Sequence, residues 1–283
     1  MFDRLGRYSR FVKMEHTLFS LPLLFSGAIL ALGGVPSWRL SVLIVLSGFG
    51  ARTAAFALNR VIDRKLDRLN PRTAVRELPA GAMTLLEACG VGLAGTVLYL
   101  GAAWAIAPIC LAVSPIPLAV FALYPYLKRV TSLAHFGVGL ADALAPLGGW
   151  LAAKQSFTDL GPALWLGAFT FFWVSGFDVI YATMDESFDR AHGLHSLPSR
   201  YGTEKALHIS GFLHALAFLS LSILYAVYFR TGVALATLLV IGGLLWLEHH
   251  LSDDVDLAFF KINAVLSFGI LGFVATGIVR GIQ

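Results

Sequence analysis

The sequence predicts an all-α integral membrane protein in which nine transmembrane helices form a single bundle. Of its 283 residues, 57% are apolar and only 13% are charged, and the mean hydropathy is +0.76. A soluble domain is usually about 45–50% apolar and about 25% charged. The composition therefore excludes an ordinary water-soluble enzyme, a disordered protein and a secreted disulfide scaffold.

Apolar runs of about 20 residues predict the helices, because a segment of that length crosses the hydrocarbon core. They lie at 15–33, 39–66, 84–103, 106–127, 133–152, 162–188, 204–229, 232–251 and 256–280. No change of composition or flexible linker divides the chain, so we expect one membrane domain over residues 1–283. Nothing in the composition indicates a nucleic-acid partner, and membrane lipid is the expected surrounding.

Turn and stop residues separate the runs in order along the chain. The first run ends at Gly33–Pro36, the second is followed by Asn70–Pro71, and the third begins after Pro79–Gly81. Gly161–Pro162 opens the sixth run, and Thr231–Gly232 separates the seventh from the eighth. These breaks predict where the connecting loops lie.

Basic residues predict the orientation of the bundle. The leader before the first span is basic, as in a signal peptide, but no convincing small-residue cleavage site follows, so we interpret the first span as retained. Most other basic residues flank the same side as the leader. The opposite side carries Arg39, Lys154, Arg230 and Arg280. The positive-inside rule therefore predicts a cytoplasmic N-terminus in the cytoplasmic (inner) membrane.

Two acidic clusters lie at the predicted cytoplasmic ends of the second and sixth helices. At about 100° per residue, the members of each cluster fall on one helical face. Because the sixth helix comes four helices after the second, both helices run in the same direction and end at the same membrane face. The first cluster consists of Asn59, Asp63 and Asp67, and the second of Asp178, Asp185 and Asp189.

Carboxylates on two facing helices form an oxygen-rich site for a hard divalent cation. Mg²⁺ accepts one or two carboxylates per ion and completes its octahedron with water and substrate phosphate oxygens. One such face alone is typical of a solvated helix end. Two faces carry too many like charges to be buried without a cation.

Basic residues beside these clusters favour an anionic ligand. Arg72 and Arg76 follow the first cluster, and Lys128 and Arg129 end the fourth helix on the same side. Each of them alone is also explained as an orientation signal. Together with the carboxylates, they indicate a site for a diphosphate at a membrane face.

These motifs resemble those of the UbiA superfamily of membrane prenyltransferases over essentially the whole chain. The family's NxxxDxxxD motif matches residues 59–67, and its R-T-x-x-R-x-L-x-x-G segment matches residues 72–81. Its DxxYxxxDxxxD motif matches residues 178–189, with an Arg-x-Gly tail at 200–202, and its Y-P-x-x-K-R stretch matches 124–129.

The resemblance implies a central cavity that opens laterally to lipid, and transfer of a prenyl group from a polyprenyl diphosphate to an acceptor that is usually aromatic. It implies that Mg²⁺ is the cofactor and that the metal ligands are Asp63, Asp67, Asp185 and Asp189. The substrate-binding residues that it implies are Arg52, Asn59, Arg72, Arg76, Tyr124, Lys128 and Arg200. Asp178 and Tyr181 are the catalytic candidates, which shape the acceptor pocket or take a proton; helix-packing hydrogen bonds are the alternative.

Two isolated charges lie inside predicted spans. Arg52 is a candidate for an acceptor carboxylate or for a diphosphate, because intramembrane charges are usually functional. For Asp142 we expect an ion pair with Arg52, a position that faces water or a contact with an acceptor hydroxyl. An aspartate at this position departs from the family pattern. His16 stands where ubiquinone-pathway members typically have a different sequence, so the identity of the acceptor stays open.

We expect a Mg²⁺-dependent aromatic prenyltransferase of quinone biosynthesis that acts on an acid of the 4-hydroxybenzoate type. The same chemistry on 1,4-dihydroxy-6-naphthoate, in menaquinone formation, is the alternative. A cation- or proton-coupled transporter is the alternative from another class, but its coupling acids are expected near the bilayer midplane. A CDP-alcohol phosphotransferase needs a D-G…A-R element, which is absent.

Two smaller features have structural interpretations. Residues 90–95 match G-x-G-x-x-G, but they lie inside an apolar span, where small residues allow close helix packing. Cys89 and Cys110 lie in apolar runs, so we expect buried free thiols and no disulfide framework.

Overall fold

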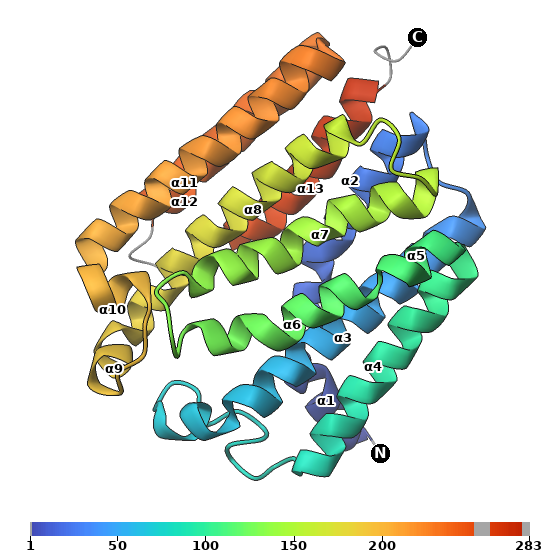
Figure 1. The fold of residues 1–283 in the computed structure, drawn as a ribbon. Coiled ribbons are helices and arrows are strands. Elements are labelled where there is room, and N and C mark those ends of the chain that lie inside the picture. The colour runs from blue at the N-terminus through green and yellow to red at the C-terminus, as the bar shows by residue number, and fades with distance from the viewer. Residues whose placement is uncertain (1, 252–260, 279–283) are drawn as a thin grey trace.

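The computed structural model describes residues 2–251 and 261–278, and every regular element in that part of the chain is a helix (Figure 1). The first helices are α1 (Phe2–Phe11), α2 (Met14–Leu32), α3 (Trp38–Leu69), α4 (Leu85–Ile106), α5 (Pro108–Val113), α6 (Pro115–Leu127) and α7 (Ala134–Lys154). The others are α8 (Gly161–Ala182), α9 (Glu186–Ala191), α10 (Leu197–Tyr201), α11 (Thr203–Leu224), α12 (Gly232–His250) and α13 (Asn263–Ile278). A 3₁₀ turn (Thr183–Asp185) follows α8, and a π-helical turn (Tyr225–Phe229) follows α11.

Seven helical segments of the described chain are long and apolar enough to cross a membrane. They are Trp38–Leu69, Leu85–Ile106, Pro108–Leu127, Ala134–Lys154, Gly161–Ala191, Thr203–Phe229 and Gly232–His250. Shorter apolar helices, Ser20–Leu32 and Asn263–Ile278, lie where the first and ninth spans are predicted. The all-helical membrane class is therefore confirmed, while the number nine stays a prediction. Residues 256–260 and 279–280 of the ninth predicted span lie outside the described residues.

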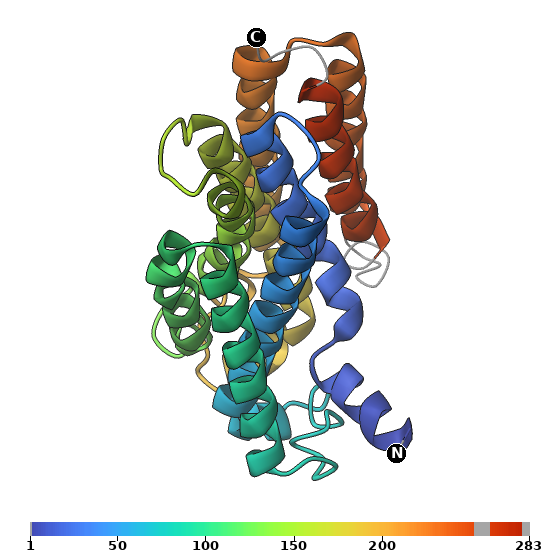
Figure 2. The same cartoon turned by 90° about the vertical axis from the view of Figure 1, so that its right-hand side faces the viewer.

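The helices form a ring that closes on itself, and α2 also packs across the ring on α7. Along the chain α3 packs on α2 and α4, α6 on α3, α7 on α6, α8 on α7, α11 on α8, and α12 on α11. The last helix, α13, packs on both α12 and α2, which closes the ring (Figure 2). The largest apolar core lies between α8, α11, α12 and α13, and contains Phe169, Leu221, Ile241 and Ile270.

Small residues let the central helices approach closely. A Cβ on Gly149 of α7 would lie 1.9 Å from the carbonyl oxygen of Leu24 on α2, and one on Gly27 of α2 would lie 1.9 Å from that of Pro146. Gly95 likewise faces the backbone of Ala54, where a Cβ would lie 2.8 Å from the amide nitrogen. The packing interpretation of residues 90–95 is therefore confirmed at Gly95 and at Gly92, where a Cβ would lie 3.1 Å from that of Ala57, but not at Gly90, where no atom lies within 4 Å.

The connection between α3 and α4 ends at a capping box. The Thr84 hydroxyl accepts a hydrogen bond from the Glu87 amide at 3.2 Å, and the Glu87 carboxylate accepts one from the Thr84 amide at 2.8 Å. These bonds satisfy amide groups that the first turn of a helix leaves unpaired. Gly81, at φ +74°, supplies the left-handed turn that precedes them.

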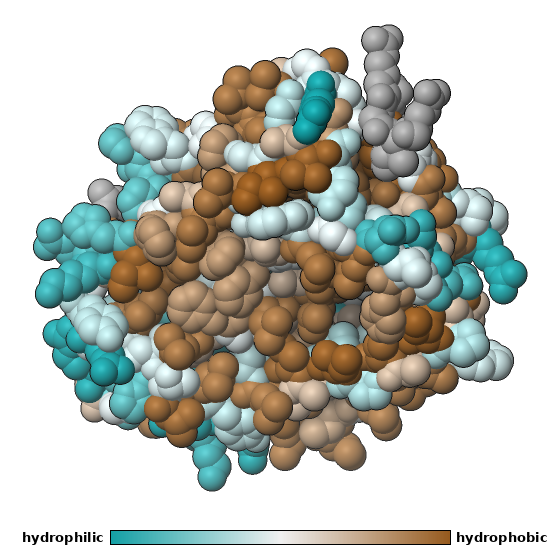
Figure 3. Space-filling model, turned by 45° about the horizontal axis from the view of Figure 1, so that its top comes forward, coloured by the Kyte–Doolittle hydropathy of each residue, from teal (hydrophilic) through white to brown (hydrophobic). Residues whose placement is uncertain are grey.

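Both acidic clusters lie at one end of the bundle, as predicted. In Figure 1 the end of α3, its connection to α4 and the short helices α9 and α10 all lie at the lower left. Figure 3 shows apolar side chains across most of one face and hydrophilic side chains gathered toward its ends, as expected of a protein surrounded by lipid.

Two expectations about local structure are wrong. The sixth helix is not continuous to residue 188, because the 3₁₀ turn Thr183–Asp185 interrupts it and changes the angle between its acidic residues. Cys89 is exposed rather than buried, because it lies on the outer face of α4. In a membrane-embedded helix an apolar environment does not require burial in the protein. Cys110 is buried as expected.

Candidate active site

A cavity of about 610 Å³ lies inside the ring of helices. Its polar end is at the end of the bundle that carries the acidic clusters, and apolar side chains such as Leu24, Phe121 and Leu151 line the rest. The predicted site residues that line it are Arg52, Asn59, Asp63, Asp67, Arg72, Arg76, Tyr124, Lys128, Asp178, Tyr181, Asp185 and Asp189. Arg200 is not among them. It is exposed on α10 and lies over the ring of Tyr201, 5.3 Å from the centroid.

The α3 carboxylates are buried and paired with cations. Asp63 accepts hydrogen bonds from Lys128 Nζ at 2.5 Å and from Arg129 Nη2 at 2.9 Å. Both oxygens of Asp67 accept from Arg76 Nη1, at 2.9 and 3.0 Å. Because Lys128 and Arg129 directly follow α6, their bonds to Asp63 join the end of α6 to the end of α3.

The carboxylate of Asp185 faces the first cluster from the α8 side. It accepts hydrogen bonds from Asn70 Nδ2 at 2.8 Å and from Arg72 Nε at 2.9 Å, and it forms a second bond to Arg72 Nη2. Arg72 also donates to the Tyr181 hydroxyl at 2.7 Å. Burial disfavours the charge on Arg72, but its bonds to Asp185 and Tyr181 outweigh burial and raise the pKa of the guanidinium.

A histidine holds the third acidic residue of the α8 side. His135 Nδ1 lies 2.7 Å from Asp178 Oδ2, and His135 Nε2 accepts a hydrogen bond from the Leu197 amide at 3.2 Å. Since Nε2 accepts, the ring hydrogen of the neutral imidazole is on Nδ1, so His135 donates to Asp178. Asp178 therefore remains an acceptor at the cavity wall.

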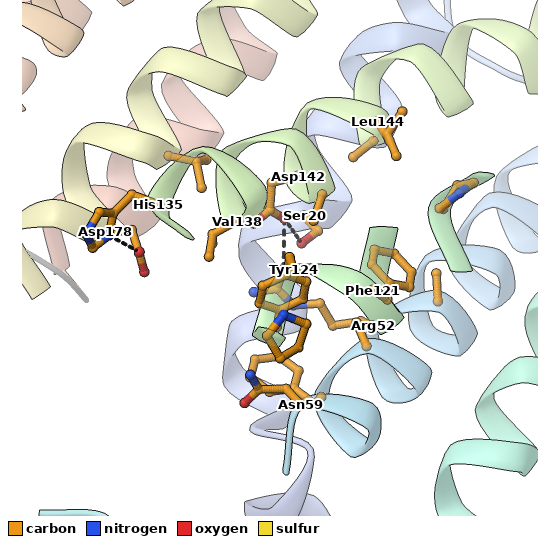
Figure 4. A pocket seen from close by; sticks show the side chains of 18 of the residues that line it. Ser20, Arg52, Asn59, Phe121, Tyr124, His135, Val138, Asp142, Leu144 and Asp178 are labelled. Carbon is orange, nitrogen blue, oxygen red and sulfur yellow. Dashed lines mark hydrogen bonds and ion pairs between the residues drawn. The ribbon is translucent and has the colours of Figure 1, made fainter. Parts of the chain in front are cut away.

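Arg52 and Asp142 form an ion pair in the middle of the bundle. Arg52 Nη1 donates to Asp142 Oδ1 at 2.8 Å, and the Ser20 hydroxyl reaches the same oxygen at 3.4 Å. Figure 4 shows this group together with Tyr124 and Asn59, while the His135–Asp178 pair lies apart from it on the cavity wall. The predicted pairing of Arg52 with Asp142 is confirmed.

The donor set of the two clusters fits Mg²⁺. The hard carboxylate oxygens of Asp63, Asp67, Asp185 and Asp189 all face one cavity, and oxygen ligands are those that Mg²⁺ prefers. Within the described residues no three acidic, histidine or cysteine side chains converge on one point. A Mg²⁺ ion here would therefore rely on substrate oxygens to complete its coordination, as Mg²⁺ in phosphate-binding sites usually does.

The structure adds residues that the sequence did not indicate. His135, Asn70, Ser20 and Arg60 all line the cavity. The sequence predicts only a turn at Asn70, and His135 pairs with a residue 43 positions away. Neither has a local pattern that predicts its role. The position of Ser20, a polar residue inside an apolar segment, is the one feature of the sequence that indicates a place in the cavity wall.

The family model of UbiA prenyltransferases matches residues 20–265. The chain belongs to the UbiA prenyltransferase family. It is therefore a membrane enzyme that transfers prenyl groups, and the transporter alternative has no support.

Similar proteins agree with this membership of the UbiA family. The chain is 29% identical over 261 residues to a 4-hydroxybenzoate octaprenyltransferase from Vibrio campbellii, covering 88% of each chain. It is 30% identical over 240 residues to one from Tolumonas auensis, covering 83% of each.

Among solved structures, the apo UbiA homologue from Aeropyrum pernix K1 is 33% identical, with a TM-score of 0.84, covering 90% of this chain and 95% of that one. A UbiA homologue from Archaeoglobus fulgidus, bound to GPP and Mg²⁺, is 21% identical with a TM-score of 0.71. It covers 95% of this chain and 99% of that one. This second likeness supports the fold alone.

Proposed function

We propose that this UbiA-family enzyme transfers a polyprenyl group from a polyprenyl diphosphate to a ring carbon of an aromatic acid of the 4-hydroxybenzoate type, with Mg²⁺ as cofactor. The observation that carries the proposal is one cavity with a charged end, rich in paired carboxylates and cations, that continues into an apolar interior. The charged end suits a diphosphate and the apolar part suits a prenyl chain. Several relatives of the chain are named 4-hydroxybenzoate octaprenyltransferases.

The ion pairs of the charged end suggest how the diphosphate binds. Asp63, Asp67 and Asp185 are each neutralised by lysine or arginine. Bound Mg²⁺ would occupy these carboxylates, neutralise the diphosphate and improve it as a leaving group. Lys128, Arg72 and Arg76, relieved of their carboxylate partners, would then donate to the diphosphate oxygens, with Asn59 beside them.

The middle of the cavity suits the acceptor. Arg52 donates to Asp142 from Nη1, and its buried Nε has no hydrogen-bond partner. The remaining N–H donors of the guanidinium can therefore bind an acceptor carboxylate. Tyr124 and Phe121 provide aromatic surface beside it. Aromatic faces also stabilise cations, and a cavity poor in water suppresses hydrolysis of a reactive intermediate.

In the proposed reaction the bond between prenyl C1 and the diphosphate oxygen breaks, and its electron pair leaves with the diphosphate. The allylic cation accepts an electron pair from the ring carbon, which forms the new C–C bond. The ring then loses its proton to a carboxylate. We assign this role to Asp178, because His135 holds that side chain at the cavity wall as an acceptor, with Tyr181 as the second candidate.

An acceptor assay tests the proposed function. Membranes that contain the protein are given a polyprenyl diphosphate and Mg²⁺ with either 4-hydroxybenzoate or 1,4-dihydroxy-6-naphthoate, and a parallel reaction contains EDTA. Asp63→Ala is the test variant, and Asp159→Ala is its matched control, because Asp159 is exposed and outside the cavity.

Prenylation of 4-hydroxybenzoate that EDTA and Asp63→Ala abolish and Asp159→Ala leaves unchanged would support the proposal. Prenylation of the naphthoate alone would replace the acceptor but keep the chemistry. If folded protein forms no prenylated product with either acid, both acceptors are excluded.

We further propose that the bundle has nine spans, with the N-terminus and the charged end of the cavity at the cytoplasmic face of the inner membrane. The distribution of basic residues supports this orientation. The two shorter apolar helices, Ser20–Leu32 and Asn263–Ile278, would complete the count.

A further inference from the structure

Arg60 is a buried cation at the charged end of the cavity. It follows Asn59 on α3, lines the cavity and has only 4% of its surface exposed. Its Nη1 atom is buried without a hydrogen-bond partner. Burying a charge is costly unless a counter-ion and hydrogen bonds compensate it, so the missing partner needs an explanation.

The other arginines that line the cavity each have a carboxylate. Arg52 pairs with Asp142 at 2.8 Å, Arg76 pairs with Asp67 at 2.9 Å, and Arg72 pairs with Asp185. Among the described residues, no carboxylate forms an ion pair with Arg60. Arg60 therefore differs from its neighbours in having no internal counter-ion.

The acidic residue best placed to pair with Arg60 is already used. Asp67 follows Arg60 by seven residues, so the two lie about 20° apart on the same helical stripe. Both oxygens of Asp67 accept hydrogen bonds from Arg76. A second acid near Arg60, Glu77, pairs with Arg10 at 3.7 Å. Both nearby acids thus have another arginine as their ion-pair partner, and neither forms an ion pair with Arg60 among the described residues.

We propose that Arg60 is an additional anion-binding residue, and that the oxyanion of a substrate supplies its missing counter-ion. The anion is a diphosphate or an aromatic carboxylate, either of which accepts the paired hydrogen bonds of a guanidinium. The proposal rests on the proposed function for its substrates, but its test measures binding and does not need turnover.

This assignment has a thermodynamic consequence. The unpaired charge of Arg60 destabilises the free enzyme, and the bound anion removes that penalty. Arg60 therefore contributes to affinity while it opposes stability, which is the opposite of what a residue with a purely structural role does.

The test compares three full-length variants in detergent. Arg60→Gln removes the charge, and Arg60→Lys keeps it. Arg64→Gln is the matched control, because Arg64 lies four residues further along α3, is half-buried, donates to the Val61 carbonyl and does not line the cavity. Calorimetry measures the binding of geranyl diphosphate, inorganic pyrophosphate and 4-hydroxybenzoate, each with Mg²⁺ and with EDTA, and the Tm of the free protein is measured in parallel.

We expect Arg60→Gln to weaken binding of one class of anion by at least about tenfold, the loss expected for a charge-assisted hydrogen bond. Arg64→Gln leaves binding unchanged, and Arg60→Lys has an affinity between those of the wild type and Arg60→Gln, because lysine keeps the charge but not the paired hydrogen bonds. The Tm of free Arg60→Gln is equal to or above that of the wild type. A loss confined to pyrophosphate and geranyl diphosphate identifies the diphosphate as the anion, and one confined to 4-hydroxybenzoate identifies the carboxylate.

Arg60→Gln that binds all three ligands as tightly as Arg64→Gln overturns the proposal. So does a fall in Tm in both Arg60 variants without any difference in affinity, since Arg60 then has a structural role. Wild-type protein that binds geranyl diphosphate but prenylates neither acid overturns the proposed function and leaves this test intact.

Discussion

His135 shows how one side chain can fix the state of another. It donates from Nδ1 to Asp178 and accepts at Nε2 from the Leu197 amide. We expect Asp178→Asn to lower kcat on the order of 100-fold, the usual size of a general-base contribution. His135→Asn, which keeps a donor near the position of Nδ1, should retain more activity than His135→Gln.

Prenyl-transfer assays with saturating substrates measure these effects, and His208→Asn, on the exposed face of α11, is the control. Equal losses in His135→Asn and His135→Gln would contradict the assigned donor, because only the Asn side chain places an amide near Nδ1.

Arg52 and Asp142 are expected to act as a unit. Their charged atoms are 2.8 Å apart, and each side chain is 19% exposed. In a double-mutant cycle of Arg52→Gln and Asp142→Asn, contacting partners should show a coupling of about 1–3 kcal/mol in the free energy of unfolding. Asp142→Asn should also lower the KM for the acceptor more than it changes kcat, because it releases the Arg52 guanidinium to bind the acceptor carboxylate. Purely additive effects on stability would show that the pair is not coupled in the membrane.

At the scale of the helix, the contact of α2 with α7 depends on glycine. Gly149→Ala would place a Cβ 1.9 Å from the Leu24 carbonyl oxygen, so the two helices must separate. Overpacking usually costs about 1–3 kcal/mol, and we expect a lower Tm in detergent. Gly90→Ala is the control, because no atom lies within 4 Å of its added Cβ. A Tm for Gly149→Ala equal to that of Gly90→Ala would mean that the helices pack less closely than described.

Helices were more predictable than their interruptions. Hydropathy alone located all seven of the long apolar helices, because a span must satisfy its backbone hydrogen bonds internally. The 3₁₀ turn Thr183–Asp185 has no proline or glycine to indicate it. The short helix α10, by contrast, has local signals, because Ser196 caps it, Pro198 lies in its first turn and Gly202 ends it.

The sequence predicts which types of residue form the site, but not which of these residues pair with one another. Periodicity placed Asn59, Asp63 and Asp67 on one face, and all three line the cavity. Which cation neutralises which acid depends on how the helices pack, so the bond of Asp185 to Arg72, across 113 residues, has no local signal. The sequence also gives no sign that Arg60 lacks an ion-pair partner, because the absence of a neighbouring carboxylate can be recognised only in the three-dimensional structure.

For the whole molecule, metal and donor substrate are expected to stabilise the fold together. If Mg²⁺ and a diphosphate share the charged end of the cavity, each must raise the affinity for the other by the same factor. Geranyl diphosphate should therefore raise the Tm with Mg²⁺ and have little effect with EDTA. A ligand at 100 times its Kd contributes about 2.7 kcal/mol. An equal shift with EDTA would exclude metal-dependent binding of the donor.

The orientation of the bundle has its own test. In a background of Cys89→Ser and Cys110→Ala, we would introduce Arg39→Cys or Arg190→Cys, both at exposed positions. An impermeant thiol reagent should label Arg39→Cys in intact spheroplasts and Arg190→Cys only in inverted vesicles, because the two positions lie at opposite ends of the bundle. Labelling of both from the same side would contradict the orientation that the basic residues predict.

The packing of α2 on both α7 and α13 determines the order in which the wall of the cavity is completed. Leu23 and Leu24 of α2 and Asn263 of α13 all line it, so its wall joins segments more than 200 residues apart in the sequence. A ribosome makes α2 early and α13 late. Except for Asn263, the residues that line the cavity lie between Lys13 and Ser196, so most of its wall is synthesised before α13. The last helix adds one polar residue to a wall that the earlier helices have already formed.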